Sequence, residues 1–404
     1  MTHLTFFKRA ALTTLAASLV ACGSMAPDYQ RPAAPVPAQF PVTGDVAAPT
    51  TQVADMPWQT FFADARLQQL IRIALDNNRD LRVALLNVEQ ARASVDARRA
   101  DRWPTMNAGL GLTRGAVANG GVTTSISAGL LVTSYEIDLF DRLRSQSDAA
   151  FAQYLASGEA GKAAQISLIG AVAHTYFALQ ADSALLDLAQ QTLATREDSA
   201  KLIQLRFDKG ASSQLDLSQA QSLLQASRVS VAQSTRQRML DANALNLLLG
   251  QAAPVELTAA GTQAPVQLQE LPVGLSSDVL LRRPDVVQAE QQLLAANANM
   301  GAARAAFFPK ILLTANAGSV SSELANLFKD GTFGWSLAPQ LLLPIFDAGR
   351  NQANLAVAKV SRDVAVAQYE KAIQSAFREV ADALAGRATL GEQARAQQAQ
   401  TAAE

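Results

Sequence analysis

Few side chains in this sequence could perform acid–base, nucleophilic or metal chemistry. The chain has two histidines, His3 near its start and His174 within a stretch of helical periodicity. With a single cysteine and no second histidine nearby, His174 has no zinc-ligand spacing around it, and we interpret it as a helix-packing or lumen-facing residue. Neither a phosphate-binding glycine loop nor a dinucleotide fingerprint occurs. We therefore expect no enzyme activity, no metal site and no cofactor held by catalytic residues.

The one residue with a clear chemical use is Cys22, the only cysteine of the 404-residue chain. Lys8 and Arg9 precede an apolar stretch, which is typical of a signal peptide covering residues 1–21. This stretch ends in Leu19-Val20-Ala21-Cys22, which resembles the processing box of bacterial lipoproteins. We expect Cys22 to become the mature N-terminus and to carry covalent lipid. A plain signal peptide that contains a cysteine by chance is the alternative.

Residues 22–57 are expected to form an extended tether behind that lipid. They contain seven of the fifteen prolines, and proline removes backbone donors and disfavours helix. The fold should begin near Trp58. The formal net charge of −1 gives no electrostatic case for binding nucleic acid.

The remainder of the chain contains an internal sequence repeat. A helix-like run opens at Asp80 and ends at Pro104, and a similar run opens at Asp285 and ends at Pro309, both at an offset of 205 residues. Leu139-Phe140-Asp141 matches Ile345-Phe346-Asp347 at an offset of 206 residues. The period is too long for a solenoid repeat. We predict a first repeat over 58–250, a linker over 251–283 and a second repeat over 284–404.

Each repeat contains two stretches with the alternating pattern of strands. Residues 105–113 and 125–132 place apolar side chains at every second position, and the phase changes around Ser134, which indicates a bulge. A glycine-rich loop over 115–121 is predicted to form the hairpin tip. In the second repeat the alternation covers 311–317 and 333–345, although Pro339 and Pro344 weaken the last strand.

Four strands cannot close a barrel, and an open sheet edge is not tolerated in lipid. Small bacterial barrels begin at about 8 strands, so three copies of this chain would supply enough strands to close one. We therefore predict a mainly α-helical protein with a small membrane β part: a homotrimer with a 12-stranded β-barrel, continued by a barrel of long helices. Two ordinary surface hairpins on a soluble helical protein are the alternative.

The helices are predicted from the absence of proline. Residues 142–208 would form a helix of about 100 Å, and residues 213–249 a returning helix, with a reversal at Lys209-Gly210-Ala211-Ser212. An isolated coiled-coil rod is the alternative. In the linker, Ser277 is predicted to cap a short helix and Pro284 to begin the next one.

Several motifs resemble those of the outer-membrane factor family, the TolC-like channels, in the lipoprotein branch that serves resistance-nodulation-division (RND) efflux pumps. They are spread over the mature chain and comprise Ala26-Pro27-Asp28-Tyr29-Gln30-Arg31-Pro32, Leu139-Phe140-Asp141-Arg142, residues 274–286 and residues 343–350. Ser276 stands where the family usually has proline. The resemblance implies an outer-membrane location with a long periplasmic extension.

Arg206 and Gly210, with the later Asp216, resemble the family's periplasmic hairpin tip. The resemblance implies that Arg206 and Gly210 dock the membrane-fusion adaptor and that Asp216 lines the periplasmic constriction. Two simpler roles stay open, because Gly210 can be a helix C-cap and Asp216 a solvated residue in the first helical turn. By repeat symmetry the second tip would fall near residues 411–421, beyond Glu404.

The function implied by the resemblance is a passive exit duct for small molecules such as drugs and toxic compounds. Its partners would be two further copies of the chain, a periplasmic adaptor, an inner-membrane RND transporter and outer-membrane lipid. An exit duct for secreted proteins on the same scaffold, or a structural envelope lipoprotein without a channel, are the alternatives.

Overall fold

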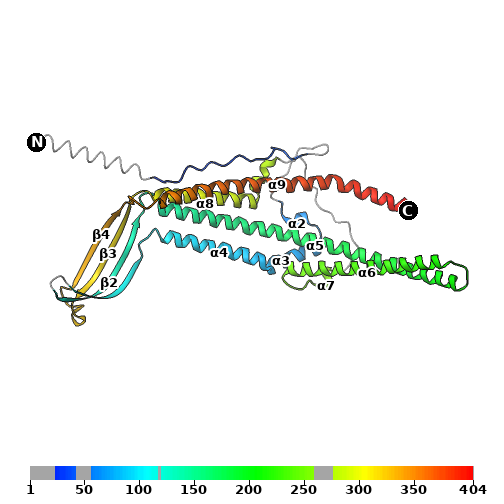
Figure 1. Ribbon diagram of the computed structural model, residues 1–404, viewed down its shortest axis with the longest axis horizontal. Helices are drawn as coiled ribbons and strands as arrows, with labels where there is room; N and C mark the ends of the chain where they lie inside the picture. Colours follow the sequence, from blue (N-terminus) through cyan, green and yellow to red (C-terminus); the bar gives the residue numbers. More distant parts are fainter. Residues whose placement is uncertain (1–22, 42–55, 117–119, 259–275, 404) are drawn as a thin grey trace. The chain divides into compact units, whose positions relative to one another are not determined.

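The order helix, two strands, long helix occurs twice in the computed structural model, which describes residues 23–41, 56–116, 120–258 and 276–403 (Figure 1). The first set is α4 (Arg79–Ala100), β1 (Met106–Ala116), β2 (Val122–Ile137) and α5 (Arg142–Asp208). The second set is α8 (Pro284–Ala305), β3 (Lys310–Ser321), β4 (Phe333–Leu342) and α9 (Arg350–Ala403). The duplication inferred from the 205-residue offset is therefore present in the fold.

The remaining elements are short, apart from the returning helix of the hairpin. They are α2 (Trp58–Phe61), α3 (Ala65–Asn77), α6 (Gln214–Leu249), α7 (Val255–Thr258) and two 3-10 helices, η2 (Ser277–Arg282) and η3 (Leu324–Asn326). None of the described helices combines the length and the apolarity that crossing a bilayer requires.

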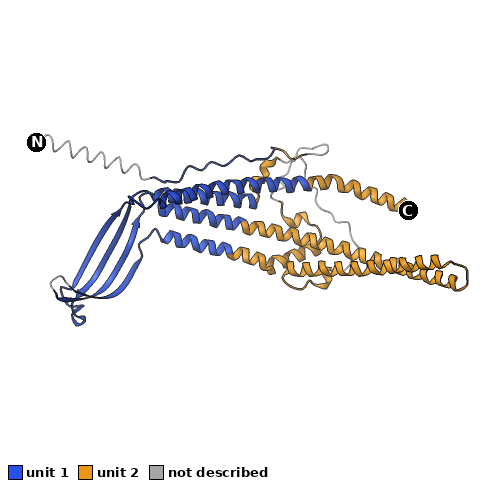
Figure 2. Cartoon of the chain, viewed as in Figure 1, with its two compact units in different colours: residues 1–37, 87–159, 285–382 blue, residues 38–86, 160–284, 383–404 orange. Residues whose placement is uncertain are grey.

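Two compact units divide the chain across its long helices (Figure 2). The first contains residues 1–37, 87–159 and 285–382, and the second contains residues 38–86, 160–284 and 383–404. The first unit holds the sheet and α8, whereas the second holds α3 and the hairpin of α5 and α6.

The sheet is antiparallel, with the strand order β1-β2-β3-β4. The change of phase predicted around Ser134 is a β-bulge: the register between β2 and β3 shifts between Val132 and Tyr135, and Ser134 has a φ of 54°. The bulge keeps β2 continuous while it turns the following side chains to the other face.

The strand boundaries differ from the prediction at two places. β1 continues through Gly115 and Ala116, which pair with Thr123 and Val122, so the first part of the predicted loop is strand. β4 ends at Leu342 rather than near Ile345, whereas Pro339 lies inside it, opposite Leu313. Proline is tolerated there because β4 is an outer strand of the sheet and has a partner on one side only.

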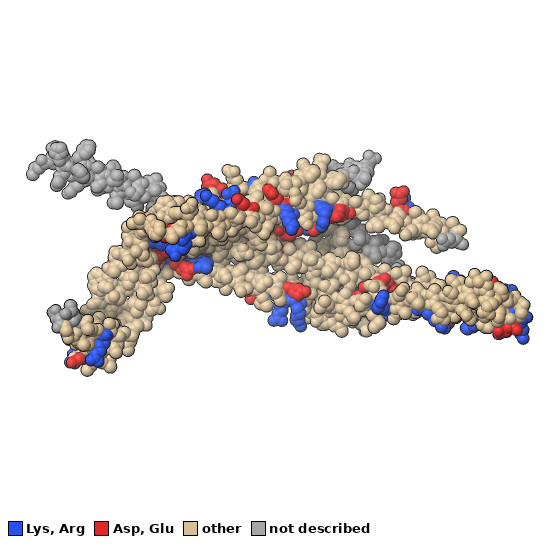
Figure 3. All heavy atoms as spheres, in the orientation of Figure 1, with Lys and Arg blue, Asp and Glu red and all other residues tan. Residues whose placement is uncertain are grey.

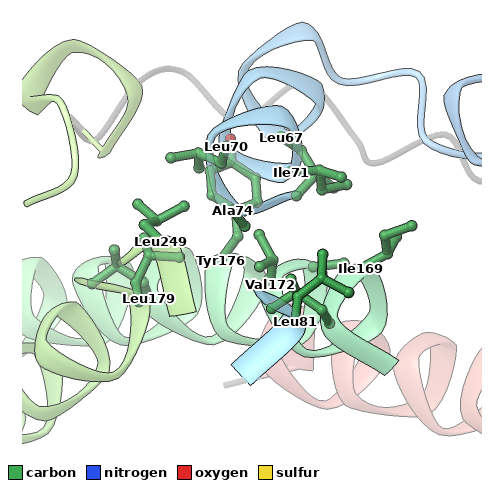
Figure 4. Close-up of a cluster of buried hydrophobic side chains, with 13 residues drawn as sticks. Leu67, Leu70, Ile71, Ala74, Leu81, Ile169, Val172, Tyr176, Leu179 and Leu249 are labelled. Atoms are coloured by element: carbon green, nitrogen blue, oxygen red, sulfur yellow. The ribbon is translucent and has the colours of Figure 1, made fainter. Parts of the chain in front are cut away.

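The second unit has its core where α3 packs against α5 and α6 (Figure 4). α3 buries one face at helical spacing, through Leu67, Leu70, Ile71 and Ala74. Fully buried side chains from the other two helices, among them Val172, Leu245 and Leu249, complete the cluster. Asp64 caps α3 by accepting from the amides of Arg66 and Leu67, and it also accepts from the Tyr176 hydroxyl at 2.9 Å.

The described N-terminal residues run in extended form along the first unit's helix α8 as far as residue 37 (Figure 1). In the second unit, Gln39 forms an isolated bridge to Ser276, and the Ser277 amide donates to Ala38. The helix η2 is capped by Ser276, which accepts from the Asp278 amide, so the prediction of Ser277 as the cap was wrong by one residue. Ser277 is instead buried. Pro284 begins α8 as predicted.

Candidate functional site

One face of the sheet is apolar and exposed. The register places Leu110 opposite Ala128 in the first strand pair, and Leu130, Ala317 and Trp335 in one row across the other three strands. The side chains of Leu110 and Trp335 are 72% and 74% exposed. An exposed apolar face of this kind marks a surface that contacts lipid or another chain.

The opposite face is mostly small and polar, and it contains Asn107, Ser127 and Asn316. A row of four glycines also lies on it, because Gly109 pairs with Gly129, Gly129 with Gly318, and Gly318 with Gly334. A Cβ at Gly129 would overlap the carbonyl oxygen of Ala317, so β2 and β3 approach closely there. Glycine in a strand permits such a close approach of two backbones, because neither residue of the pair carries a side chain.

Charged side chains are confined to the two ends of the sheet. The central stretches of all four strands contain none, and the sheet is tan between its ends on the face shown in Figure 3. Along β3 and the residues just after it, the uncharged stretch lies between Lys310 and Glu323. At about 3.3 Å per residue and a tilt of about 40°, it would span about 30 Å, the thickness of the hydrocarbon layer.

A half-buried ion pair joins the sheet to the long helix, at the end of the sheet where β2 leads into α5. Arg142, the first residue of α5, contacts both carboxylate oxygens of Glu136 at 2.7 and 2.6 Å. The hydrogen bond to Glu136 raises the pKa of Arg142 further above its ordinary value. Phe140 stacks on Phe308 at 4.7 Å between ring centres, which fixes the same junction to the second repeat.

The hairpin tip lies where the sequence predicted it. α5 ends in a Schellman motif, in which Ala211 donates to the Arg206 carbonyl and Gly210 to the Phe207 carbonyl. Gly210 has a φ of 71°, and a Cβ there would meet no other atom. Arg206 and Gly210 are both exposed. Gly210 therefore is the C-cap, and its surroundings leave room for a partner.

Asp216 forms a capping box at the start of α6. The Ser213 hydroxyl accepts from the Asp216 amide, and the Asp216 carboxylate accepts from the amide of Ser213 and from the hydroxyls of Ser212 and Ser213. These bonds, the backbone one first, lower the pKa of Asp216. The carboxylate is thus ionised and exposed at the tip, and it also holds the turn.

The other predicted residues add no second site. Cys22 lies outside the described residues. His174 is exposed on α5. Within the described ranges, no group of three His, Cys, Asp or Glu side chains could hold a metal ion. Sequence reasoning missed Glu290, a buried carboxylate of α8 that binds the N-terminal segment. The available signal was the recurrence of Glu290, Asn297 and Arg304 at intervals of seven residues, on a helix otherwise rich in alanine.

Comparison with known proteins agrees with this architecture. The family model of outer membrane efflux proteins matches residues 70–251 and 275–404. The antibiotic efflux pump outer membrane protein ArpC of Pseudomonas putida is 46% identical over 385 residues, which are 93% of this chain and 79% of ArpC. Outer membrane protein OprJ of Pseudomonas aeruginosa is 45% identical, over 93% of this chain and 80% of OprJ.

Solved structures give the same result. The open state of the Neisseria gonorrhoeae MtrE outer membrane channel is similar with a TM-score of 0.84 and 40% identity, covering 94% of this chain and 86% of MtrE. CusC is similar with a TM-score of 0.83 and 42% identity, covering 94% of this chain and 87% of CusC. The fold is thus that of solved outer-membrane channels, and this chain belongs to the outer membrane efflux protein family.

Proposed function

We propose that three copies of this chain form one continuous conduit, in which the sheets close a membrane barrel and the helices extend it into the periplasm. The observation that carries this proposal is the four-stranded sheet with one apolar face, one small and polar face, and unpaired outer edges on β1 and β4. An unpaired edge is not tolerated in lipid, so the edges need partners from other copies.

The exposed apolar side chains of the helices support the same assembly. Leu85 and Leu86 on α4 and Val357, Val360 and Val364 on α9 are each at least half exposed in the single chain. Monomeric proteins rarely expose so many large apolar residues together, whereas neighbouring copies would cover them. Within this conduit, toxic small molecules would pass along the polar face without a dedicated pocket.

Two substitutions on β1 test which face meets lipid. Leu110→Arg puts a charge on the apolar face, at a cost of about 2–4 kcal/mol near the middle of the bilayer, so it should prevent insertion and conductance in planar bilayers. Thr113→Arg, on the other face of the same strand, should insert normally and shift ion selectivity toward anions. Equal conductance of both variants would contradict the proposed orientation.

The tip supplies the proposed docking surface for a periplasmic adaptor, which would connect the duct to an inner-membrane RND transporter. Arg206 is exposed beside the open space around Gly210, and a substitution there leaves the backbone bonds of the turn in place. We expect Arg206→Ala to reduce adaptor cross-linking at the tip and export in cells. Arg228→Ala, which removes an exposed arginine farther along α6, serves as the matched control. Equal effects would exclude a specific role for Arg206.

Asp216 is proposed to line the periplasmic constriction, where three carboxylates in a ring would attract cations. Because Asp216 also caps α6, its replacement must keep the turn. Asp216→Asn retains a side-chain acceptor for the Ser213 amide while removing the charge. We expect lower cation selectivity with an unchanged helical content. Unaltered selectivity would place Asp216 away from the ion path.

Covalent lipid on Cys22 is proposed as the anchor at the outer membrane. Cells fed a labelled fatty acid should incorporate it into the wild-type chain but not into Cys22→Ser. Label in the variant, or its absence from the wild type, would contradict the assignment.

A further inference from the structure

The motif Ala26–Pro32, which follows the lipidation box, has no role in the conduit described above. In the structure, two of its side chains converge on one carboxylate of α8. The Arg31 guanidinium contacts Glu290 at 2.6 Å through Nε and at 2.9 Å through a terminal nitrogen, and the Tyr29 hydroxyl donates to the same carboxylate at 3.1 Å. This is a bidentate pair supplemented by a third hydrogen bond.

The carboxylate lies in a socket. With the segment in place, the side chain of Glu290 is 9% exposed and that of Arg31 is 52% exposed, so the acid is covered more fully than its basic partner. Tyr369 of α9 is fully buried beside this site, and its hydroxyl has no hydrogen-bond partner among the described residues. Burial and the nearby Glu290 raise the pKa of Tyr29, which keeps its hydroxyl protonated as a donor.

A second set of contacts holds the part of the segment closer to Cys22. Asn297 donates to the Pro27 carbonyl at 2.8 Å, and Arg304 donates to the Met25 carbonyl at 3.3 Å. Gly301 lies between them, and a Cβ there would come within 2.8 Å of Ala26. Glu290, Asn297 and Arg304 are seven residues apart and share one face of α8. That face of α8 therefore holds an extended peptide along its length. We call the contacts made by Asn297, Gly301 and Arg304 the track.

We propose that Tyr29 and Arg31 form a latch on Glu290 that positions the lipid-bearing end of the chain at the strand end of α8. The latch and the track fix Met25 beside Arg304, six residues before β3 begins. Without the latch and the track, the first attachment after the lipid would be the bridge between Gln39 and Ser276. The latch thus converts a long proline-rich tether into a short link of fixed length between membrane anchor and sheet.

This inference is independent of what the conduit exports, and it can be tested on the full-length lipidated protein in detergent. A spin label at Asp28→Cys, an exposed position inside the motif, reports the mobility of the segment. Lipidated Cys22 has no free thiol and stays unlabelled. We expect an immobilised spectrum in the otherwise wild-type chain. Glu290→Gln should raise the mobile fraction about tenfold, because Arg31 loses its charged partner.

Gly301→Ala distinguishes loss of the segment's attachment to α8 from a general loss of stability. Alanine favours helix over glycine, so this variant should leave α8 at least as stable, but its Cβ displaces Ala26 and should mobilise the label. Gly170→Ala in α5 is the matched control, since a Cβ there meets nothing within 4 Å and the label should stay immobilised. The charge-swapped pair Arg31→Glu with Glu290→Arg should restore part of the immobilisation.

A non-lipidated Cys22→Ser chain, exported by a plain signal peptide, shows whether the latch or the lipid immobilises the label. If the latch holds the segment, the label stays immobilised in this chain. The proposal is overturned if loss of the lipid alone mobilises the label, if Glu290→Gln and Gly301→Ala leave it immobile, or if Gly170→Ala mobilises it equally.

Discussion

The glycine row of the sheet makes a quantitative prediction, because the structure shows how much room each glycine has. A Cβ at Gly129 would overlap the Ala317 carbonyl oxygen and lie 2.6 Å from the Gly318 Cα. A Cβ at Gly318 would overlap the Ala128 carbonyl oxygen and lie 2.5 Å from the Gly129 Cα. Contacts between carbon atoms are ordinarily about 3.5–4.0 Å, so β2 and β3 would have to separate by about 1 Å.

Such a separation stretches the ladder hydrogen bonds on either side of the row. Losing two of them costs about 2 kcal/mol, and residual overlap adds about 1–2 kcal/mol. We therefore expect Gly129→Ala and Gly318→Ala each to lower the free energy of unfolding by about 3–4 kcal/mol. Gly109→Ala meets only the flexible end of Leu131, at 2.8 Å, and should cost about 1 kcal/mol.

Gly334→Ala meets no atom within 4 Å and should be neutral or stabilising by up to about 1 kcal/mol in a single chain. Urea unfolding of chains dissociated by detergent, followed by tryptophan fluorescence, measures all four variants, since Trp335 lies within the sheet. A cost below about 1 kcal/mol at both Gly129 and Gly318 would refute the close approach of β2 and β3.

Two further predictions concern the second unit. Leu245→Ala, at a fully buried position, should lower the unfolding free energy by about 2–5 kcal/mol, whereas Leu247→Ala, at a position 77% exposed, should change it by less than about 0.5 kcal/mol in the same urea assay. Burial and the bond to Asp64 raise the pKa of Tyr176 to about 12. Because this folded pKa is above the unfolded value, stability should be full below pH 10 and fall as the pH rises to 12; thermal melts should show this fall and lose it in Tyr176→Phe.

The sequence predicted the features that depend on local patterns. Long proline-free runs gave α5 and α6 to within a residue, because helix needs only backbone continuity and a repeating apolar face. The bulge at Ser134 was visible as a change of phase, because side chains alternate strictly along a strand. Boundaries were predicted less accurately, as at Gly115, which pairs with Thr123 in the sheet, and at the end of β4, which lies at Leu342. Whether a strand continues depends on pairing with its neighbour, which local sequence does not show.

Features that depend on distant contacts could not be predicted in this way. Glu290 pairs with Arg31 across 259 positions of sequence, and no local pattern around either residue predicts this partner. The row of glycines across four strands was equally hidden, because it requires the register of every strand pair. The roles of Gly210 and Asp216 in the turn were foreseen as alternatives, since capping is a local interaction.

The glycine row also connects the fold of one chain to the proposed assembly. The sequence Asn107-Ala108-Gly109 in β1 recurs as Asn316-Ala317-Gly318 in β3, so both sequence repeats contribute to the glycine row. Its two inner members touch each other, whereas Gly109 and Gly334 lie on the outer strands. If copies join through β1 and β4, the outer glycines would be crowded as the inner ones are. Gly334→Ala, harmless in dissociated chains, should then prevent heat-sensitive oligomers on gels, and oligomers at the wild-type level would show that these edges do not meet at this row.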